Sequence, residues 1–184
     1  MTDSLILRID QGLELQLLNG GHADELYELT DKNRDYLRLW LPWLDSNKYL
    51  QNTIDYIDNC QKLYTQNLSI QLCISYKCKI AGVVGFQRID WLNRSTSIGY
   101  WLGEFYQGNG LITKSCRNLI NYGFSSLGLN RIEIRCAVEN VKSQAIPNRL
   151  GFKREGTIRE AEWLYDHYVD HIIYGMLKSD WDLS

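Results

Sequence analysis

The fold of this chain is predicted mainly from one segment, Tyr106-Gln107-Gly108-Asn109-Gly110-Leu111-Ile112-Thr113. It joins an apolar segment that ends at Leu102 to the start of an amphipathic one. Gly108 and Gly110 have no side chains and can adopt backbone angles that other residues avoid. Successive amide N–H groups can then point into one concavity, with the positive end of a helix behind them, which suits a diphosphate. A turn that only connects a strand to a helix is the alternative, and this segment alone leaves both open.

The residues of this turn exclude two common nucleotide motifs. No Gly-Lys-Ser/Thr sequence follows, so the turn is not a Walker loop. Thr113 stands where the dinucleotide pattern requires its third glycine. No lysine lies within the turn itself, so backbone amides would have to bind the phosphates. A diphosphate site therefore remains possible, but not one for ATP or NAD in their usual motifs.

The segments on either side of the turn predict a strand, a helix and a second strand. Ser69–Tyr76, Lys79–Ile89 and Ser95–Leu102 have strand character and are joined by short turns, which predicts antiparallel pairing. Leu111–Leu127 carries apolar residues at helical spacing, and Arg131–Val138 alternates apolar and charged residues. The strands before and after this helix should therefore form a parallel unit.

The remaining segments complete an α/β (α+β) fold. We expect an N-terminal hairpin, two helices before the strands, and a helix and two strands at the end: Leu5–Ile9 and Leu13–Leu17, His22–Leu41 and Thr53–Tyr64, then Val141–Leu150, Lys153–Ile158 and Val169–Leu177. This order fits one mixed, mostly antiparallel central sheet with helices on both faces. Because the chain has 184 residues, no repeat and no Pro/Gly/Ser-rich linker, residues 1–184 are expected to form a single domain.

The composition excludes several classes of function. The chain has 20 basic and 22 acidic residues, without the basic excess of a nucleic-acid binder. No apolar stretch approaches the roughly 18 residues of a membrane span, and the N-terminus does not resemble a signal peptide. The 5 cysteines contain no C-x-x-C pair and suit free thiols in a reducing compartment. No two histidines share helical i, i+4 spacing with a carboxylate partner, so no metal-ligand set is present. We expect a cytoplasmic protein that binds neither nucleic acid, membrane nor metal.

In this context the chain resembles the GNAT superfamily of N-acetyltransferases, and most of all its branch of ribosomal-protein N-terminal acetyltransferases, the RimJ/RimL type. The superfamily signature Gln/Arg-x-x-Gly-x-Gly/Ala is matched by Gln107 to Ile112, with Ile112 departing from the small last residue. Further segments resemble the branch in the same order: Gly99–Glu104, Leu129–Glu133, Val138–Ser143, Ile146–Phe152 and Arg159–Trp163. The resemblance covers nearly the whole chain.

The resemblance implies a fold in which two central strands splay apart and acetyl-CoA lies in the gap. The residues that it assigns to the coenzyme are Leu102, Gly103, Gln107, Gly108, Asn109, Gly110, Leu111, Ile112, Thr113, Asn140 and Ser143. The turn would bind the diphosphate, the backbone near Leu102 and Gly103 would hold the acetyl carbonyl and its oxyanion, and Asn140 would bind the pantetheine arm. Capping of the following helix is an alternative role for Asn140.

The resemblance also implies the catalytic groups. Acetyl transfer needs a neutral amine, a stabilised oxyanion and a protonated thiolate leaving group. Many superfamily members carry a tyrosine acid seven residues after the asparagine, but here that position is Pro147. The RimL-like branch implies Ser143 as the acid or thiol partner and Glu162 as the base, with Glu104 as a rival base. Pro147 also removes the helical hydrogen bond to the carbonyl of residue 143.

The amine that accepts the acetyl group is the part of the reaction that the sequence specifies least. Four aromatic residues are candidates to line its groove: Trp40, Trp43, Trp163 and Tyr165. The branch implies direct transfer to the N-terminal amine of a ribosomal protein, in a ternary complex. A small-molecule amine such as a polyamine or aminoglycoside is one alternative, and a non-catalytic acyl-CoA-binding module is another. We expect a homo-oligomer, because the last strand is apolar and proteins of this branch often form homo-oligomers.

Overall fold

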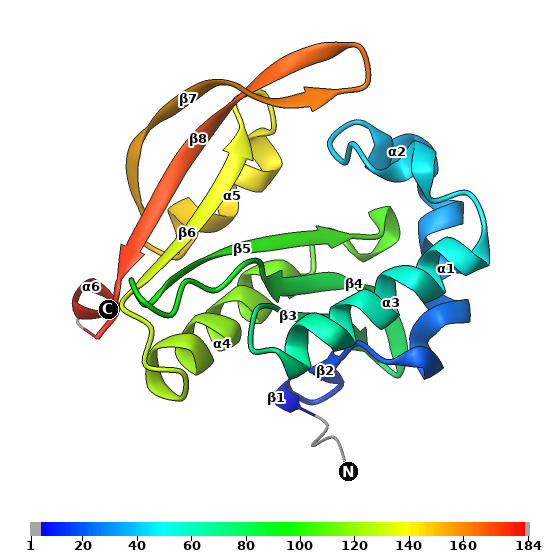
Figure 1. Ribbon diagram of the computed structural model, residues 1–184, viewed down its shortest axis with the longest axis horizontal. Coiled ribbons are helices and arrows are strands. Elements are labelled where there is room, and N and C mark those ends of the chain that lie inside the picture. Colours follow the sequence, from blue (N-terminus) through cyan, green and yellow to red (C-terminus); the bar gives the residue numbers. More distant parts are fainter. Residues whose placement is uncertain (1–4, 183–184) are drawn as a thin grey trace.

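The computed structural model describes residues 5–182 and contains one sheet of eight strands (Figure 1). The strands are β1 (Ile6–Asp10), β2 (Leu13–Leu17), β3 (Ile70–Tyr76), β4 (Lys79–Phe86), β5 (Ser95–Leu102), β6 (Arg131–Ala137), β7 (Lys153–Leu164) and β8 (His167–Leu177). Their order across the sheet is β1-β2-β3-β4-β5-β6-β8-β7. Every described pair is antiparallel except β5 with β6. The predicted mixed, mostly antiparallel sheet is thereby confirmed.

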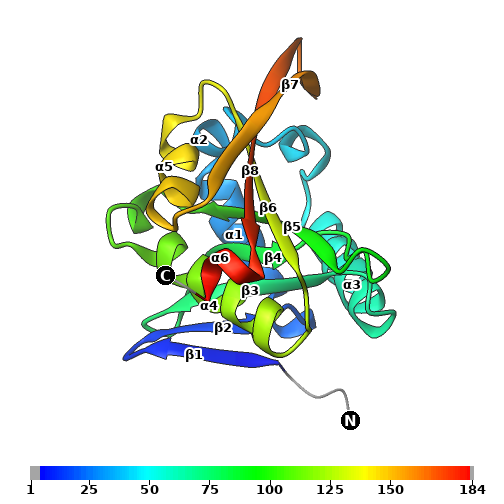
Figure 2. The same cartoon turned by 90° about the vertical axis from the view of Figure 1, so that its left-hand side faces the viewer.

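The helices cover both faces of this sheet, as the sequence predicted. They are α1 (Ala23–Lys32), α2 (Arg34–Arg38), α3 (Leu50–Thr65), α4 (Leu111–Ser125), α5 (Val141–Arg149) and α6 (Lys178–Trp181). α1 packs against β4 and α3 against β3, whereas α4 packs against β1, β2, β4 and β5. With the molecule turned by 90°, α3 lies on one side of the strands and α4 and α5 lie on the other (Figure 2). Among the described residues, no helix is long and apolar enough to cross a membrane.

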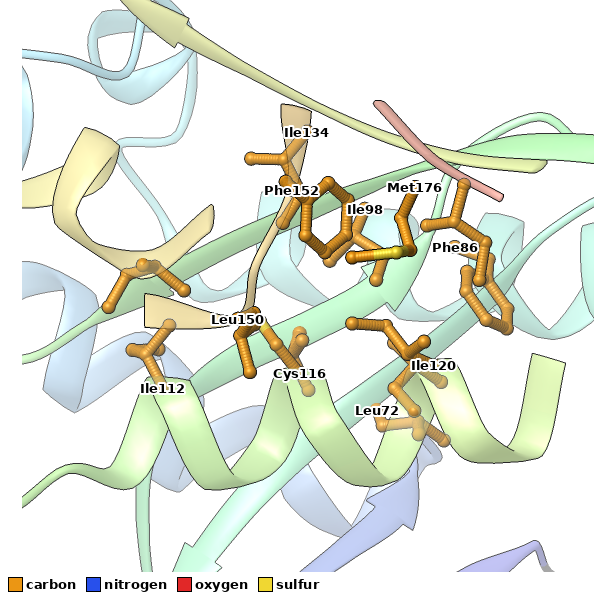
Figure 3. Packing of buried hydrophobic residues seen from close by; sticks show 14 of the residues in the cluster. Leu72, Phe86, Ile98, Ile112, Cys116, Ile120, Ile134, Leu150, Phe152 and Met176 are labelled. Carbon is orange, nitrogen blue, oxygen red and sulfur yellow. The ribbon is translucent and has the colours of Figure 1, made fainter. Parts of the chain in front are cut away.

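The main hydrophobic core lies between the sheet and α4. Ile112, Cys116 and Ile120 recur every fourth residue and point from one face of α4 toward the strands, where Figure 3 shows them beneath Ile98 and Phe152. This spacing is why the segment forms an amphipathic helix. A smaller cluster under α1 and α3 holds the other face of the sheet. The two cores thus hold the central strands in place from both faces of the sheet.

The two central strands separate halfway along their length. β5 pairs with β6 only from Ser95 with Arg131 to Ile98 with Ile134. Beyond that point β5 remains paired with β4, and β6 with β8. Figure 1 shows β5 and β6 diverging beyond this paired region. The expected splayed strands are therefore present, and their inner edges face a gap.

The segment predicted as one helix over His22–Leu41 is interrupted, and that prediction was wrong. α1 ends at Lys32, and Asn33 has non-helical backbone angles. The Asn33 side chain is 7% exposed, donates from Nδ2 to the Leu29 carbonyl at 2.7 Å and accepts at Oδ1 from the Glu104 N–H at 2.9 Å. Because its amide bonds both to the helix that ends and to a distant loop, Asn33 stabilises the interruption.

Several predicted boundaries also shift. α3 begins at Leu50 instead of Thr53, β4 ends at Phe86 instead of Ile89, α4 ends at Ser125 instead of Leu127, β7 runs to Leu164 instead of Ile158, and β8 begins at His167 instead of Val169. The largest shift is in β7, which continues past an irregularity between Ile158 and Glu162. Glu160 within it has a φ of 49°. β7 advances four residues here while β8 advances two, and this bulge lets the strand keep its partner through a stretch whose charged residues give no strand pattern.

Candidate active site

The turn before α4 has the geometry of an anion cradle. Gly108 and Gly110 have φ angles of 77° and 69°, and no protein atom lies within 4 Å of where a Cβ would stand on either. The Asn109 side chain folds back and donates to the carbonyls of Tyr106 and Gln107, both at 3.1 Å. Gly110 is the N-cap of α4 and provides no side-chain cap. The open backbone and the helix N-terminus together can accommodate a diphosphate.

Two basic side chains reach this turn from α5. Lys142 donates from Nζ to Gln107 Oε1 at 3.1 Å, and Arg149 donates from Nη1 to Thr113 Oγ1 at 3.1 Å. Gln107 Nε2 is buried and has no hydrogen-bond partner in the described part of the chain. The turn itself contains no lysine, and these two cations were not predicted from the sequence. Their spacing of seven residues on one helix, which places them on one face, was the available signal.

The turn opens into a cavity of about 1750 Å³ that is lined from both faces of the sheet. Its wall includes Ile112 of α4 on one side and Tyr56 of α3 on the other. The predicted site residues that it brings together are Trp40, Trp43, Leu102, Gln107, Gly108, Gly110, Leu111, Ile112, Thr113, Asn140, Ser143 and Glu162. Gly103, Asn109, Trp163 and Tyr165 are not part of the wall. One continuous space therefore connects the turn before α4, the candidate phosphate turn, with the predicted catalytic groups.

The edge of β5 presents backbone groups to the gap. The Gly103 N–H donates to the Ala81 carbonyl of β4 at 2.8 Å and is thus occupied. Successive residues of a strand direct their N–H groups to opposite edges. The Leu102 N–H therefore points toward the gap, and it is the one of the two amides that can meet an oxyanion.

Ser143 lies in a small network of neutral polar groups at the start of α5. Its N–H donates to Asn140 Oδ1 at 3.0 Å, so Asn140 caps the helix. Its Oγ donates to Cys136 Sγ at 3.2 Å and lies 3.2 Å from the Tyr100 hydroxyl. Tyr100 Oη also donates to the Ser143 carbonyl at 3.0 Å. Burial raises the pKa of the Tyr100 hydroxyl well above its ordinary value, and burial likewise raises the pKa of the Cys136 thiol.

Of the two candidate bases, only Glu162 lines the cavity. Its Oε2 lies 3.5 Å from Nε2 of His171 on the neighbouring strand, and both side chains line the same wall. Glu104 lies outside the wall, and its backbone N–H is bound by Asn33. Glu162, with His171 as its neighbour, is therefore the candidate base whose carboxylate faces the cavity.

The four predicted aromatic residues fall into two groups. Trp40 and Trp43 line the cavity, and the Trp43 ring lies 6.3 Å from that of Trp101. Trp163 is 50% exposed and packs edge-on against Tyr168, away from the cavity wall. Tyr165 is held elsewhere: its hydroxyl donates to the Leu41 carbonyl at 2.5 Å, and the Arg38 guanidinium lies 3.8 Å from its ring centroid. The β7–β8 turn is thereby attached to the segment that follows α2.

Comparison with known proteins identifies this arrangement. The family model described as "Acetyltransferase (GNAT) domain" matches residues 13–153, which is most of the chain. The chain belongs to the GNAT acetyltransferase family. It is therefore an enzyme of the acyltransferase class. The resemblance drawn from the turn and its neighbouring segments is confirmed.

Individual GNAT proteins are similar over nearly their full lengths. The ribosomal-protein-serine acetyltransferase of Escherichia coli (strain K12) is 32% identical over 96% of this chain and 98% of its own. The ribosomal L7/L12 alpha-N-protein acetyltransferase RimL, solved in complex with coenzyme A, superposes with a TM-score of 0.92 at 28% identity, covering 96% of this chain and 99% of its own. The microcin C7 self immunity acetyltransferase MccE, solved with acetyl-CoA and AMP, gives 0.89 at 31% identity over 93% and 95%.

Proposed function

We propose that this GNAT enzyme transfers the acetyl group of acetyl-CoA directly to the N-terminal amine of a polypeptide, of the ribosomal-protein kind, within a ternary complex. The observation that carries the proposal is the single cavity that joins the phosphate turn to Glu162 across the gap between β5 and β6. Both substrates can occupy that space together. Cys136 is buried and its pKa is raised, which disfavours a thiolate and hence an acetyl-enzyme route.

The residues on one side of the gap fit coenzyme A. The backbone from Gly108 to Thr113 would bind its diphosphate, and Lys142 and Arg149 would add positive charge beside it. Binding of the diphosphate would also give the unpartnered Gln107 Nε2 an acceptor. Because these groups come from both the turn and α5, the cofactor would bridge the two.

The chemistry can then be assigned to the chain's own groups. Glu162 accepts a proton from the amine, whose nitrogen forms a bond to the acetyl carbon. The Leu102 N–H stabilises the negative oxygen that forms on attack. When the carbon–sulfur bond breaks, Ser143 Oγ donates a hydrogen bond to the leaving sulfur, which finally takes up the proton lost by the amine. The products are an acetylated amine and free coenzyme A.

The acceptor side favours a peptide amine for two reasons. An α-amine has a pKa near 8 and is partly neutral at cellular pH, whereas a lysine amine, near 10.4, would need stronger deprotonation. The cavity wall also includes side-chain amides that can bind an extended backbone, namely Asn52, Asn59, Gln71 and Gln87. The Escherichia coli relative named as a ribosomal-protein-serine acetyltransferase supports the same class of acceptor.

A small-molecule amine is the second candidate acceptor. The structural similarity to MccE, which was solved with both acetyl-CoA and AMP, favours it. The same amide-lined wall can bind a ligand rich in hydroxyl groups or a nucleotide.

The test is coenzyme A release from acetyl-CoA, measured against N-terminal peptides that include ribosomal ones, and against polyamines, aminoglycosides and amine-bearing nucleotides. Turnover with peptides only supports the proposal, and turnover with small amines only contradicts it. If no amine releases coenzyme A while acetyl-CoA binds, the chain is a binding module. Initial rates at several concentrations of both substrates should give intersecting reciprocal plots, since parallel plots indicate an acetyl-enzyme.

Variants test the catalytic assignments. Ser143→Ala and Glu162→Gln should each lower kcat by about a hundredfold, the usual size of a lost acid–base contribution. Glu104→Gln is the matched control, because Glu104 lies outside the cavity wall, and it should retain kcat. Full activity in Glu162→Gln together with loss in Glu104→Gln would reverse the choice of base.

A further inference from the structure

We infer that Tyr100 is a positioning residue of this active site: its hydroxyl replaces the amide hydrogen that Pro147 lacks and so holds Ser143 in place beside the gap. The inference rests on the proposed function, in which Ser143 contacts the sulfur. Tyr100, Cys136 and Ser143 all line the cavity.

The need for such a partner follows from the sequence of α5. In a regular α-helix the carbonyl of residue 143 accepts a hydrogen bond from the N–H of residue 147. That residue is Pro147, which lies inside α5, is buried, and has no N–H. A partly buried carbonyl without a partner is costly. Tyr100 Oη lies 3.0 Å from the Ser143 carbonyl and must be the donor, because a carbonyl can only accept.

This hydrogen bond determines what the other groups can do. Tyr100 has one hydroxyl hydrogen and uses it on the carbonyl, so its oxygen can only accept from Ser143 Oγ, 3.2 Å away. Burial raises the pKa of Tyr100, which keeps the phenol protonated. The Ser143 Oγ hydrogen then has two acceptors in the structure, Tyr100 Oη and Cys136 Sγ at 3.2 Å. It is the hydrogen that can turn toward a negatively charged sulfur entering the gap.

Ser143 is consequently held at both backbone ends. Asn140 Oδ1 accepts from its N–H at 3.0 Å, and Tyr100 donates to its carbonyl. Asn140 is the N-cap of the same helix, whereas Tyr100 belongs to β5, so the Tyr100 contact ties the backbone of the first turn of α5 directly to β5. Without the Tyr100 hydrogen bond, the turn that carries Ser143 would keep its Asn140 cap but would no longer be held in a fixed position relative to β5.

The test is a double-variant cycle of Tyr100→Phe and Pro147→Ala. Tyr100→Phe should lower kcat about tenfold, as expected for loss of one hydrogen bond to a partly buried group, with the KM for acetyl-CoA within about twofold of wild type. Pro147→Ala alone should leave kcat within about twofold. In the double variant, the alanine N–H can bond to the Ser143 carbonyl, so most of the lost kcat should return.

Tyr174→Phe is the matched control. Tyr174 is buried, and its hydroxyl donates to Gln144 Oε1 on the same helix at 3.3 Å without touching Ser143. This variant should keep kcat. Circular dichroism and thermal midpoints show whether each variant is folded. If Tyr100→Phe does not fold, Pro147→Ala is the second variant that is measured.

Hydrogen exchange of the α5 amides is measured alongside the kinetics, because this measurement does not require the amine substrate to be known. Exchange should rise in Tyr100→Phe and fall back in the double variant. A double variant as slow as Tyr100→Phe would show that the phenol hydrogen itself serves the reaction, and unchanged kcat and exchange in Tyr100→Phe would show no role; both overturn the inference. A wild-type enzyme that acetylates no amine defeats the proposed function, while the exchange measurement still decides whether Tyr100 holds α5.

Discussion

Replacing Gly110 with alanine separates phosphate binding from simple backbone strain. Gly110 has a φ of 69°, and a Cβ there would have no protein atom within 4 Å. The folded protein would therefore suffer no clash, only the cost of a left-handed alanine, about 1 kcal/mol. That cost corresponds to a fall in Tm of roughly 2–4 °C for a chain of this size. The added methyl group would also stand in the concavity, so the Kd for coenzyme A should rise at least about tenfold.

Gly128 provides a matched control in the turn between α4 and β6. Its φ is 65°, and it too has no protein atom within 4 Å of a Cβ position. Gly128→Ala should therefore lower Tm as much as Gly110→Ala does, yet leave the Kd unchanged within about twofold. Scanning calorimetry and titration calorimetry with coenzyme A measure the two quantities. Wild-type affinity in Gly110→Ala would show that the turn does not bind the diphosphate, and equal losses of affinity in both variants would mean that strain alone weakens binding.

Three further predictions concern stability. Asn140→Ala removes the cap of the Ser143 N–H and should cost about 1 kcal/mol in chemical unfolding, whereas Asn140→Asp keeps an acceptor there and should retain most of it. Arg131 donates hydrogen bonds to both carboxylate oxygens of Glu155 and thereby holds the pKa of Glu155 below the ordinary 4.5. The pair therefore stabilises the folded protein fully above pH 4.5. This stabilisation is lost as the pH falls through the lower pKa that Glu155 has in the folded state. The stability gap between wild type and Arg131→Gln should accordingly narrow on acidification below pH 4.5, and a constant gap would contradict this. Asn33→Ala loses two hydrogen bonds of a buried side chain and should cost about 2 kcal/mol in thermal or urea unfolding, and a loss below half of that would refute the account of the helix break.

The sheet and α4 could be predicted because their signals are local. α4 and β6 each carry an uninterrupted periodic pattern, β5 alternates except at Trp101, and the turn before α4 contains its two glycines within three residues. Periodicity of this kind depends only on which face is buried. The parallel pairing of β5 with β6 then followed from the length of the connection.

The break at Asn33 could not be predicted because its cause is distant. The composition from residue 22 to 41 is helical, and although Asn favours helix ends, no Gly or Pro follows Asn33 before residue 42 to mark a break. The Glu104 N–H that its side chain binds lies 71 residues further along the chain. Likewise, β7 continues beyond Ile158 because β8 offers it a partner, although residues 159–162 contain three charged residues and only one apolar residue, Ala161.

The two halves of the site differ in the same way, and this difference bears on how the enzyme can change. The proposed coenzyme half consists of two contiguous stretches, 99–113, which begins within β5, and 138–149, which follows β6, so its residues could be predicted from motifs. The proposed acceptor half comes from the helical region before β3 and the β7–β8 hairpin, which are joined by the hydrogen bond from the Tyr165 hydroxyl to the Leu41 carbonyl, 124 residues apart. No motif spans such a separation. Because the acceptor half shares few residues with the phosphate turn, substitutions in the hairpin or near Leu41 can alter the amine that is accepted while acetyl-CoA binding persists.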